Sequence, residues 1–133
     1  MKLAIITGAS AGIGSATAQA FLNDGFGVYN LARRACPIAE VASLNCDLAS
    51  GAAIDAAAAR LADVIAGSSE VALVHNASQI RKDSADHCES DALRAVLETN
   101  VVAINRLNQR LLPLLPPSSS VLYVGSTLAE KAV

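Results

Sequence analysis

The stretch KLAIITGASAGIG, Lys2–Gly14, decides the fold. Its apolar run predicts a first strand, which ends in a turn containing Gly8, Gly12 and Gly14. A helical pattern starts at once, because small and apolar residues then recur at three- and four-residue spacing. A strand that turns through glycines into a helix aims backbone N–H groups and the positive end of a helix dipole at one point. The stretch therefore predicts a phosphate site; the alternative is an ordinary glycine-rich turn.

Further apolar runs alternate with helical patterns along the rest of the chain. We expect strands at 28–32, 41–46, 71–74 and 120–124, and helices at 51–66 and 91–112. Only residues 33–40 separate the second and third strands, too few for a helical crossover, so a coil is expected there. Strands that alternate with helices predict an α/β fold, a three-layer doubly wound parallel sheet (Rossmann-like) of about five strands.

The bulk composition narrows the class of protein. A length of 133 residues suits a single domain, and 53% hydrophobic residues supply a core for it. No apolar run reaches the roughly 18 residues of a membrane span, and a net charge of -2 gives no electrostatic footprint for nucleic acid. The three cysteines, Cys36, Cys46 and Cys88, form neither an even disulfide set nor a metal-binding spacing. We therefore expect free thiols in a reducing cytoplasm, with no metal, membrane or nucleic-acid partner.

A basic pair follows the second predicted strand. In a doubly wound sheet, ligands bind beyond the carboxyl ends of the strands, and an NAD-preferring fold places an acidic residue after this strand. Arg33 and Arg34 stand there instead. A guanidinium binds phosphate oxygens bidentately and so suits a 2′-phosphate. The pair favours NADP(H), with NAD(H) less expected; the alternative is a solvated basic pair.

Other polar residues follow the third, fourth and fifth predicted strands. Asp47 suits two roles equally, leading into the next helix or bonding an adenine amino group. Residues 75–78, HNAS, are small and polar enough to line an adenosine or ribose pocket, and we assign His75 no chemistry. Ser126 is either a turn-forming serine or a hydroxyl presented at the same edge as the phosphate turn.

The long helix predicted over 91–112 carries one polar residue in its apolar stripe. Asn100 lies on the stripe and is expected to point inward, where an amide must be hydrogen-bonded. Pattern alone leaves a structural and a functional asparagine equally open. The residues of the expected buried stripe are Leu93, Val96, Leu97, Ile104, Leu107 and Leu111.

Taken together, these motifs resemble the classical short-chain dehydrogenase/reductase family over all 133 residues. Residues 7–14 match its Thr-Gly-x-x-x-Gly-x-Gly motif, and 46–48 look like its adenine-contacting aspartate. Residues 75–78 resemble its Asn-Asn-Ala-Gly motif, with His75 and Ser78 in place of the first Asn and the Gly. The resemblance implies that Asn100 and Ser126 are the family's helix asparagine and substrate-orienting serine, the two candidate catalytic residues. The candidate cofactor-binding residues are Gly8, Ser10, Ala11, Gly12, Ile13, Gly14, Arg33, Arg34, Asp47, Leu48, Asn76, Ala77 and Ser78.

The family implies reversible hydride transfer between a nicotinamide and a small-molecule carbonyl or alcohol, in a homo-oligomer formed partly through the long helix. Its catalytic Tyr-x-x-x-Lys pair is absent here, since the two tyrosines, Tyr29 and Tyr123, are both expected within strands. We therefore expect the cofactor-binding half of an NADP(H)-dependent oxidoreductase, with the C-terminal part of the family fold missing. The alternative is a non-catalytic dinucleotide-binding sensor or interaction module of the same fold.

Overall fold

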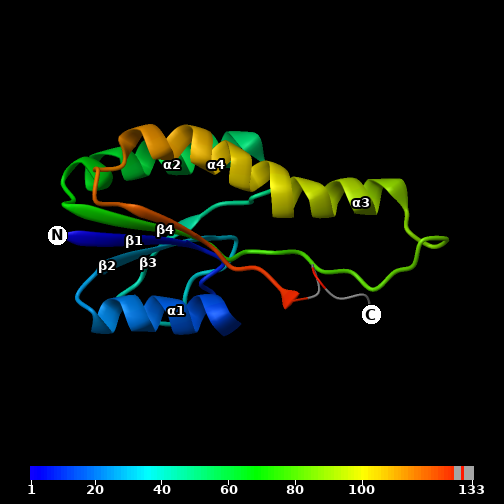
Figure 1. Ribbon diagram of the computed structural model, residues 1–133, viewed down its shortest axis with the longest axis horizontal. Helices are drawn as coiled ribbons and strands as arrows, with labels where there is room; N and C mark the ends of the chain where they lie inside the picture. Colours follow the sequence, from blue (N-terminus) through cyan, green and yellow to red (C-terminus); the bar gives the residue numbers. More distant parts are fainter. Residues whose placement is uncertain (128–129, 131–133) are drawn as a thin grey trace.

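The computed structural model describes residues 1–127 and 130, and its centre is a five-stranded parallel sheet with the strand order β3-β2-β1-β4-β5 (Figure 1). This order confirms the doubly wound sheet. Strands β2 and β3 are added on one side of β1 and strands β4 and β5 on the other, so the strand order reverses between β1 and β4. Each strand lies within two residues of its expected position. The strands are β1 (Lys2–Thr7), β2 (Gly27–Ala32), β3 (Ala42–Asn45), β4 (Glu70–His75) and β5 (Ser120–Tyr123).

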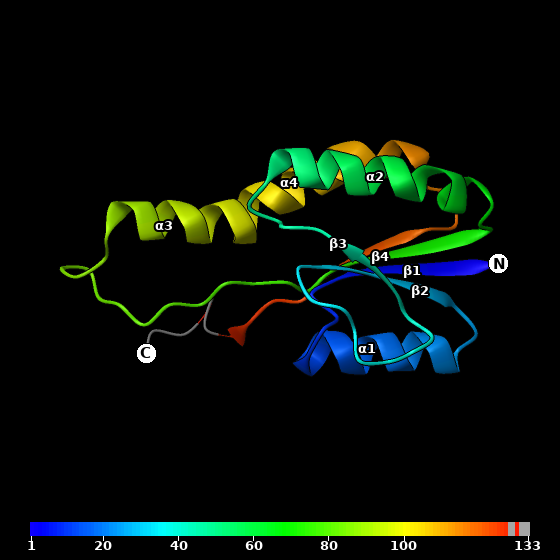
Figure 2. The same ribbon diagram turned by 180° about the vertical axis from the view of Figure 1, so that it is seen from behind.

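Helices cover both faces of the sheet. Helix α1 (Gly12–Asn23) lies on one face, and α2 (Gly51–Ala66) and α4 (Ala103–Leu111) lie side by side on the other (Figures 1 and 2). The connection between β2 and β3 contains no helix, as its length predicts. Within the described part of the chain, no helix is both long and apolar enough to cross a membrane.

Strand β1 is the centre of the core. It pairs with β2 on one side and β4 on the other, and its alternate residues belong to different layers. Leu3 and Ile5 join the cluster beneath α2 and α4, while Ala4 and Ile6 join the cluster around α1. Burying a side chain the size of Leu or Ile contributes about 1.5–3 kcal/mol, so the apolar run fixes β1 in the middle of the sheet.

The chain from residue 90 to 114 differs from the single helix expected over 91–112. Helix α3 (Ser90–Leu97) passes into a π-helical turn (Glu98–Val102), then into α4, and ends in a 3₁₀ turn (Leu112–Leu114) that contains Pro113. A π turn holds one more residue than an α turn. Because each residue turns an α-helix by about 100°, the side chains of α3 and α4 fall out of phase.

The expected buried stripe is wrong in its first half, because α3 buries none of its residues. On α4, Leu107 and Leu111 are buried. On α3, by contrast, Leu93 and Leu97 are 48% and 46% exposed. Helix α3 also extends past the end of the sheet, so no layer of the described chain covers it (Figure 2). Val96 and Ile104 are half-buried.

Candidate functional site

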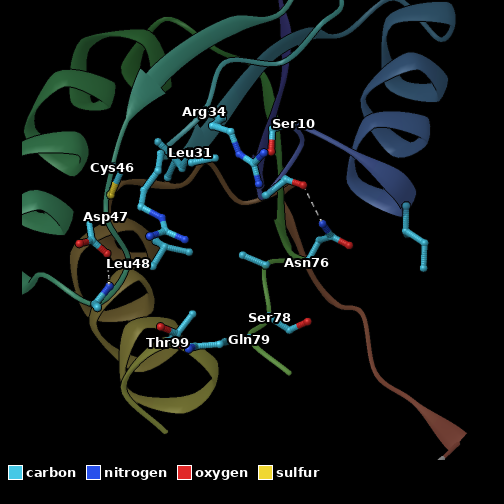
Figure 3. A pocket seen from close by; sticks show the side chains of 16 residues that line it. Ser10, Leu31, Arg34, Cys46, Asp47, Leu48, Asn76, Ser78, Gln79 and Thr99 are labelled. Carbon is cyan, nitrogen blue, oxygen red and sulfur yellow. Dashed lines mark hydrogen bonds between the residues drawn. The ribbon is translucent and has the colours of Figure 1, made fainter. Parts of the chain in front are cut away.

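A pocket of about 580 Å³ opens at the carboxyl ends of the strands, next to the point where strand order reverses (Figure 3). Its walls come from the segments that follow β1, β2, β3 and β4, and from the π turn. The lining residues are Gly8, Ser10, Ile13, Leu31, Ala32, Arg33, Arg34, Cys46, Asp47, Leu48, Ala49, Asn76, Ala77, Ser78, Gln79 and Thr99.

The structure brings ten of the thirteen candidate cofactor-binding residues together around this pocket. The other three, Ala11, Gly12 and Gly14, belong to the glycine turn but do not line it. Neither candidate catalytic residue, Asn100 or Ser126, is part of the lining. The grouping is a fact of the fold, whereas the binding role of each residue stays a prediction.

The glycine turn is shaped by conformations and approaches that other residues resist. Gly8 and Gly12 have φ angles of 73° and 56°, in the left-handed region that favours glycine. A Cβ on Gly14 would collide with the carbonyl of Gly8 and the side-chain amide of Asn76. Helix α1 starts directly after Ala11, whose side chain makes no capping bond. Its first N–H groups are therefore open to an anion, as a phosphate site requires.

Hydrogen bonds of Thr7 and Asn76 connect β1 to β4 at the carboxyl ends of the two strands. The Thr7 hydroxyl oxygen accepts the backbone N–H groups of Asn76 and Ala77, both at 3.0 Å. The Asn76 amide in turn donates to the Thr7 carbonyl at 3.1 Å, and to the Gly8 carbonyl at 3.1 Å (Figure 3). These four bonds hold the glycine turn against the segment after β4, so both sides of the pocket are fixed to each other.

Arg33 and Arg34 directly follow β2 and are exposed. Neither guanidinium forms an ion pair with any residue that the structure describes. Figure 3 shows Arg34 with Ser10 toward one end of the pocket and Thr99 with Gln79 toward the other. The pocket therefore has a cationic end that its own carboxylates do not neutralise.

Asp47 does not cap the helix that follows it. Its Oδ1 accepts the backbone N–H of Ala49 at 2.9 Å, while Ser50 caps α2 by accepting the N–H of Ala53 at 3.2 Å. Of its two sequence-derived roles, Asp47 thus shapes the turn leading into α2 and also lines the pocket. Beside it, burial raises the pKa of the Cys46 thiol, and the charge of Asp47 raises it further. Cys46 is therefore a neutral wall of the pocket near pH 7.

Asn100 lies in the π turn with its side chain fully engaged. Its Oδ1 accepts the backbone N–H of Gln79 at 2.6 Å, and its Nδ2 donates to the Gln79 carbonyl at 2.8 Å. This reciprocal pair ties the π turn to the segment after β4 and meets the demand for a satisfied inward amide. Ser126 is exposed, three residues beyond the end of β5 at the same edge of the sheet. Catalytic roles for both residues stay predictions.

The buried His75 contacts Asn108 and Tyr123, away from the pocket lining. Its Nε2 lies 2.8 Å from the Asn108 Oδ1, and the Asn108 Nδ2 donates to the Tyr123 hydroxyl at 2.9 Å. The His75 and Tyr123 rings stack at 5.1 Å. With this orientation of the amide, Nε2 carries the proton, and Nδ1 is a buried acceptor without a hydrogen-bond partner among the described residues. His75 is 3% exposed, and burial lowers its pKa, only partly offset by the bond to Asn108.

Stability is expected to fall as pH falls below 6.5, the unperturbed pKa of histidine. In that range the unfolded chain binds a proton at this position and the folded chain does not, so the free energy of unfolding drops by up to about 1.4 kcal/mol per pH unit. Urea denaturation of the wild type and His75→Gln at pH 7.5, 6.5 and 5.5 measures the effect. The matched control is His87→Gln, because His87 is exposed in a loop. Equal pH dependence in wild type and His75→Gln would contradict the assignment.

Three residues that matter for the site are absent from the sequence-derived set. Thr7 is 2% exposed and bonds the segment after β4, and Asn30 is 0% exposed and bonds the turn after β1. A polar residue inside an otherwise apolar strand is the signal that could have identified each of them. Thr99 lines the pocket from the π turn, and no local pattern marks it.

Comparison with known proteins is consistent with this architecture. The family model for short chain dehydrogenases matches residues 2–133. A short-chain dehydrogenase/reductase from Burkholderia vietnamiensis superposes with a TM-score of 0.89 at 25% identity, covering 99% of this chain and 68% of that chain. A short-chain dehydrogenase from Streptomyces avermitilis gives 0.86 at 28% identity, covering 98% and 51%.

A third structure contains a cofactor. A short chain dehydrogenase from Burkholderia cenocepacia J2315, in complex with NADP, superposes with a TM-score of 0.88 at 28% identity, covering 99% of this chain and 58% of that chain. The present chain thus spans about half to two thirds of the length of these structures. No curated protein gives a significant match. From the match over residues 2–133, the chain belongs to the short-chain dehydrogenase family.

Proposed function

We propose that this chain binds NADP(H) in preference to NAD(H), as the cofactor-binding part of an oxidoreductase acting on a small carbonyl or alcohol. The main support is the pair Arg33 and Arg34 among the residues that line the strand-end pocket. Their guanidiniums have no ion-pair partners in the described chain. The fold, the uncapped start of α1 and the family support the dinucleotide. The NADP bound to the relative from Burkholderia cenocepacia supports the extra phosphate.

The pocket offers each portion of the cofactor a matching wall. Arg33 and Arg34 would hold the 2′-phosphate through charge-assisted hydrogen bonds. Asp47 and Leu48 would take the adenine, one by hydrogen bonding and one by apolar contact. The glycine turn would take the pyrophosphate with Gly8, Ser10, Ala11, Gly12, Ile13 and Gly14, and the ribose would contact Asn76, Ala77 and Ser78.

When bound, the cofactor supplies or accepts the hydride. This chain's own contribution is then to bind and orient: we propose that Ser126 holds the substrate oxygen and that Asn100 supports the site from the π turn. Proton transfer needs a group of suitable pKa within hydrogen-bond reach. The tyrosines do not provide one, since Tyr123 accepts a bond from Asn108 and Tyr29 packs against the core. We propose that a Tyr-x-x-x-Lys pair beyond these residues completes the site.

The family and an exposed apolar face support a proposal about assembly. Leu93, Leu97, Val101 and Val102 are each more than 40% exposed on α3 and the π turn. An exposed apolar patch of this kind marks an interaction site. We propose that it is covered in a homo-oligomer of a cytoplasmic enzyme.

Replacing Arg33 and Arg34 by alanine, singly, tests the cofactor preference. A hydrogen bond to a charged group contributes about 1.5–3 kcal/mol, so we expect NADPH affinity to fall by about 10- to 100-fold for the residue that holds the 2′-phosphate, with NADH affinity nearly unchanged. Titration calorimetry with both cofactors measures this, without any need for turnover. Arg60→Ala removes the same charge from the exposed side of α2, away from the pocket, and is the control. Equal losses for NADPH and NADH would refute the 2′-phosphate assignment.

A binding result alone does not separate an enzyme from a non-catalytic module. The protein that carries this chain would be assayed for NADPH oxidation with a panel of small aldehydes and ketones. Turnover that Ser126→Ala lowers supports the oxidoreductase. NADPH binding with no turnover on any carbonyl would favour a dinucleotide-binding sensor.

A further inference from the structure

Asn30 is a fully buried amide in the middle of the apolar strand β2. It is 0% exposed and pairs in the sheet with Ile6 on one side and Ser43 on the other. It follows Val28 at the two-residue spacing of a strand and so lies on the α1 face, among apolar neighbours. A buried amide costs free energy unless it is hydrogen-bonded, so its partners show what it does.

The side chain of Asn30 joins three separate segments of the cofactor pocket. Its Oδ1 accepts the backbone N–H of Ala9, within the glycine turn, at 2.9 Å. Its Nδ2 donates to the Arg34 carbonyl at 3.1 Å and to the Ser43 hydroxyl on β3 at 3.2 Å. The Ser43 oxygen also accepts the N–H of Cys36 at 2.9 Å. Both amide protons are thus used, and the basic loop after β2 is held at Arg34 and at Cys36.

The basic loop has few other polar anchors. It contains no helix, and the connection from β2 to β3 is short. The other side-chain bond to a carbonyl of its arginines is a longer one, from Asn45 to the Arg33 carbonyl at 3.4 Å, on the exposed side. Because the Asn30 amide bonds the glycine turn with one end and the loop with the other, it sets the position of the two segments relative to each other.

We propose that Asn30 is a positioning residue for recognition of the 2′-phosphate. It holds the Arg33–Arg34 backbone in register with the glycine turn, so that the guanidiniums and the α1 N-terminus face one pocket. Ser43 contributes to the same positioning, because its hydroxyl oxygen accepts from both Asn30 and the N–H of Cys36. The inference rests on the proposed NADP(H) preference and adds to it the side chains that make the arginines effective.

The test uses two fragments that differ by the 2′-phosphate, adenosine 2′,5′-bisphosphate and 5′-AMP. The ratio of their dissociation constants, measured by calorimetry, isolates recognition of that phosphate. Ser43→Ala removes the oxygen that anchors the loop but leaves the bond between Asn30 and Ala9 in place. We expect the preference for the bisphosphate to fall about tenfold, with 5′-AMP affinity nearly unchanged; a tenfold change corresponds to about 1.4 kcal/mol.

Two further variants complete the design. Asn30→Leu removes every bond of the amide, so it is expected to weaken both fragments and also to lower the ratio. The control is Ser119→Ala, because the Ser119 oxygen likewise accepts a backbone N–H, that of Val71 at 3.1 Å, near the start of β4 and far from the pocket. The control should leave the ratio unchanged. If Asn30→Leu does not fold, Asn30→Asp takes its place, because it keeps an oxygen for the Ala9 N–H but has no Nδ2 to donate to the Arg34 carbonyl and the Ser43 hydroxyl.

The outcomes distinguish the positioning role of Asn30 from the proposed NADP(H) preference. A wild type that binds both fragments equally would overturn the NADP(H) preference, and the positioning role with it. A wild type that prefers the bisphosphate, with the same ratio in a folded Asn30 variant and in folded Ser43→Ala, would overturn only the role of Asn30 and Ser43. A purely structural contribution would lower thermal stability and leave the ratio unchanged, which counts against the proposal.

Discussion

Gly14→Ala is expected to lower the free energy of unfolding by about 3 kcal/mol, the upper part of the range for overpacking a tight site. In an exposed helix this substitution stabilises by about 1 kcal/mol, because alanine is the better helix former. Here a Cβ would collide with the carbonyl of Gly8 and the amide of Asn76. The Gly8 carbonyl is backbone held by Asn76, so it cannot turn aside as a flexible side chain could.

Chemical denaturation of the wild type and Gly14→Ala measures the loss. The matched control is Gly67→Ala at the end of α2, where φ is -85° and the nearest atom to a new Cβ is 3.6 Å away. That variant should stay within about 0.5 kcal/mol of the wild type. NADPH binding should weaken in Gly14→Ala and not in the control. Wild-type stability in Gly14→Ala would mean that the turn is looser than described.

Thr7→Val is expected to cost about 2–4 kcal/mol of unfolding free energy, despite the similar shape of the two side chains. The Thr7 oxygen accepts the N–H groups of Asn76 and Ala77. Valine leaves both donors without this partner at a nearly fully buried position, at about 1–3 kcal/mol for each. The two lost hydrogen bonds join the end of β1 to the segment after β4, which lines the pocket. The pocket should therefore widen, and both cofactor affinity and stability should fall.

Thr17→Val is the control for this prediction. The Thr17 hydroxyl donates to the Ile13 carbonyl at 2.8 Å on the solvent side of α1. Water replaces that bond, so a change within about 0.5 kcal/mol is expected. Thermal unfolding of the two variants distinguishes them, and similar melting temperatures would count against the buried acceptor role of Thr7.

The sequence predicts most of the sheet because its signals are local. Residues 2–14 contain a strand, a glycine turn and a helix start in one continuous stretch, and all three are present in the structure. The eight residues between β2 and the expected third strand were too short for a helix, which is a matter of chain length alone. The grouping of Arg33, Asp47 and Asn76 around one pocket follows because parallel strands end at the same edge.

Features that depend on distant partners were not predictable in this way. The π turn at Glu98–Val102 has no composition signature, and its Asn100 bonds a residue outside the helix, Gln79. The residue pattern of β2 places Asn30 within a strand but does not indicate its hydrogen-bond partners, which lie on three other segments. Spacing can say that a buried amide needs partners, but the three-dimensional fold decides which ones it finds.

The central position of β1 has a consequence for the order of events during synthesis. β1 leaves the ribosome first, yet its two neighbours in the sheet are β2, complete at Ala32, and β4, complete at His75, 43 residues later. At about 5–20 residues per second, translation takes about 2–9 s from the end of β2 to the end of β4, and throughout that time the β1 edge that pairs with β4 has no partner. A nascent chain that holds β1, α1 and β2 therefore carries an open apolar strand edge, which can pair with other chains.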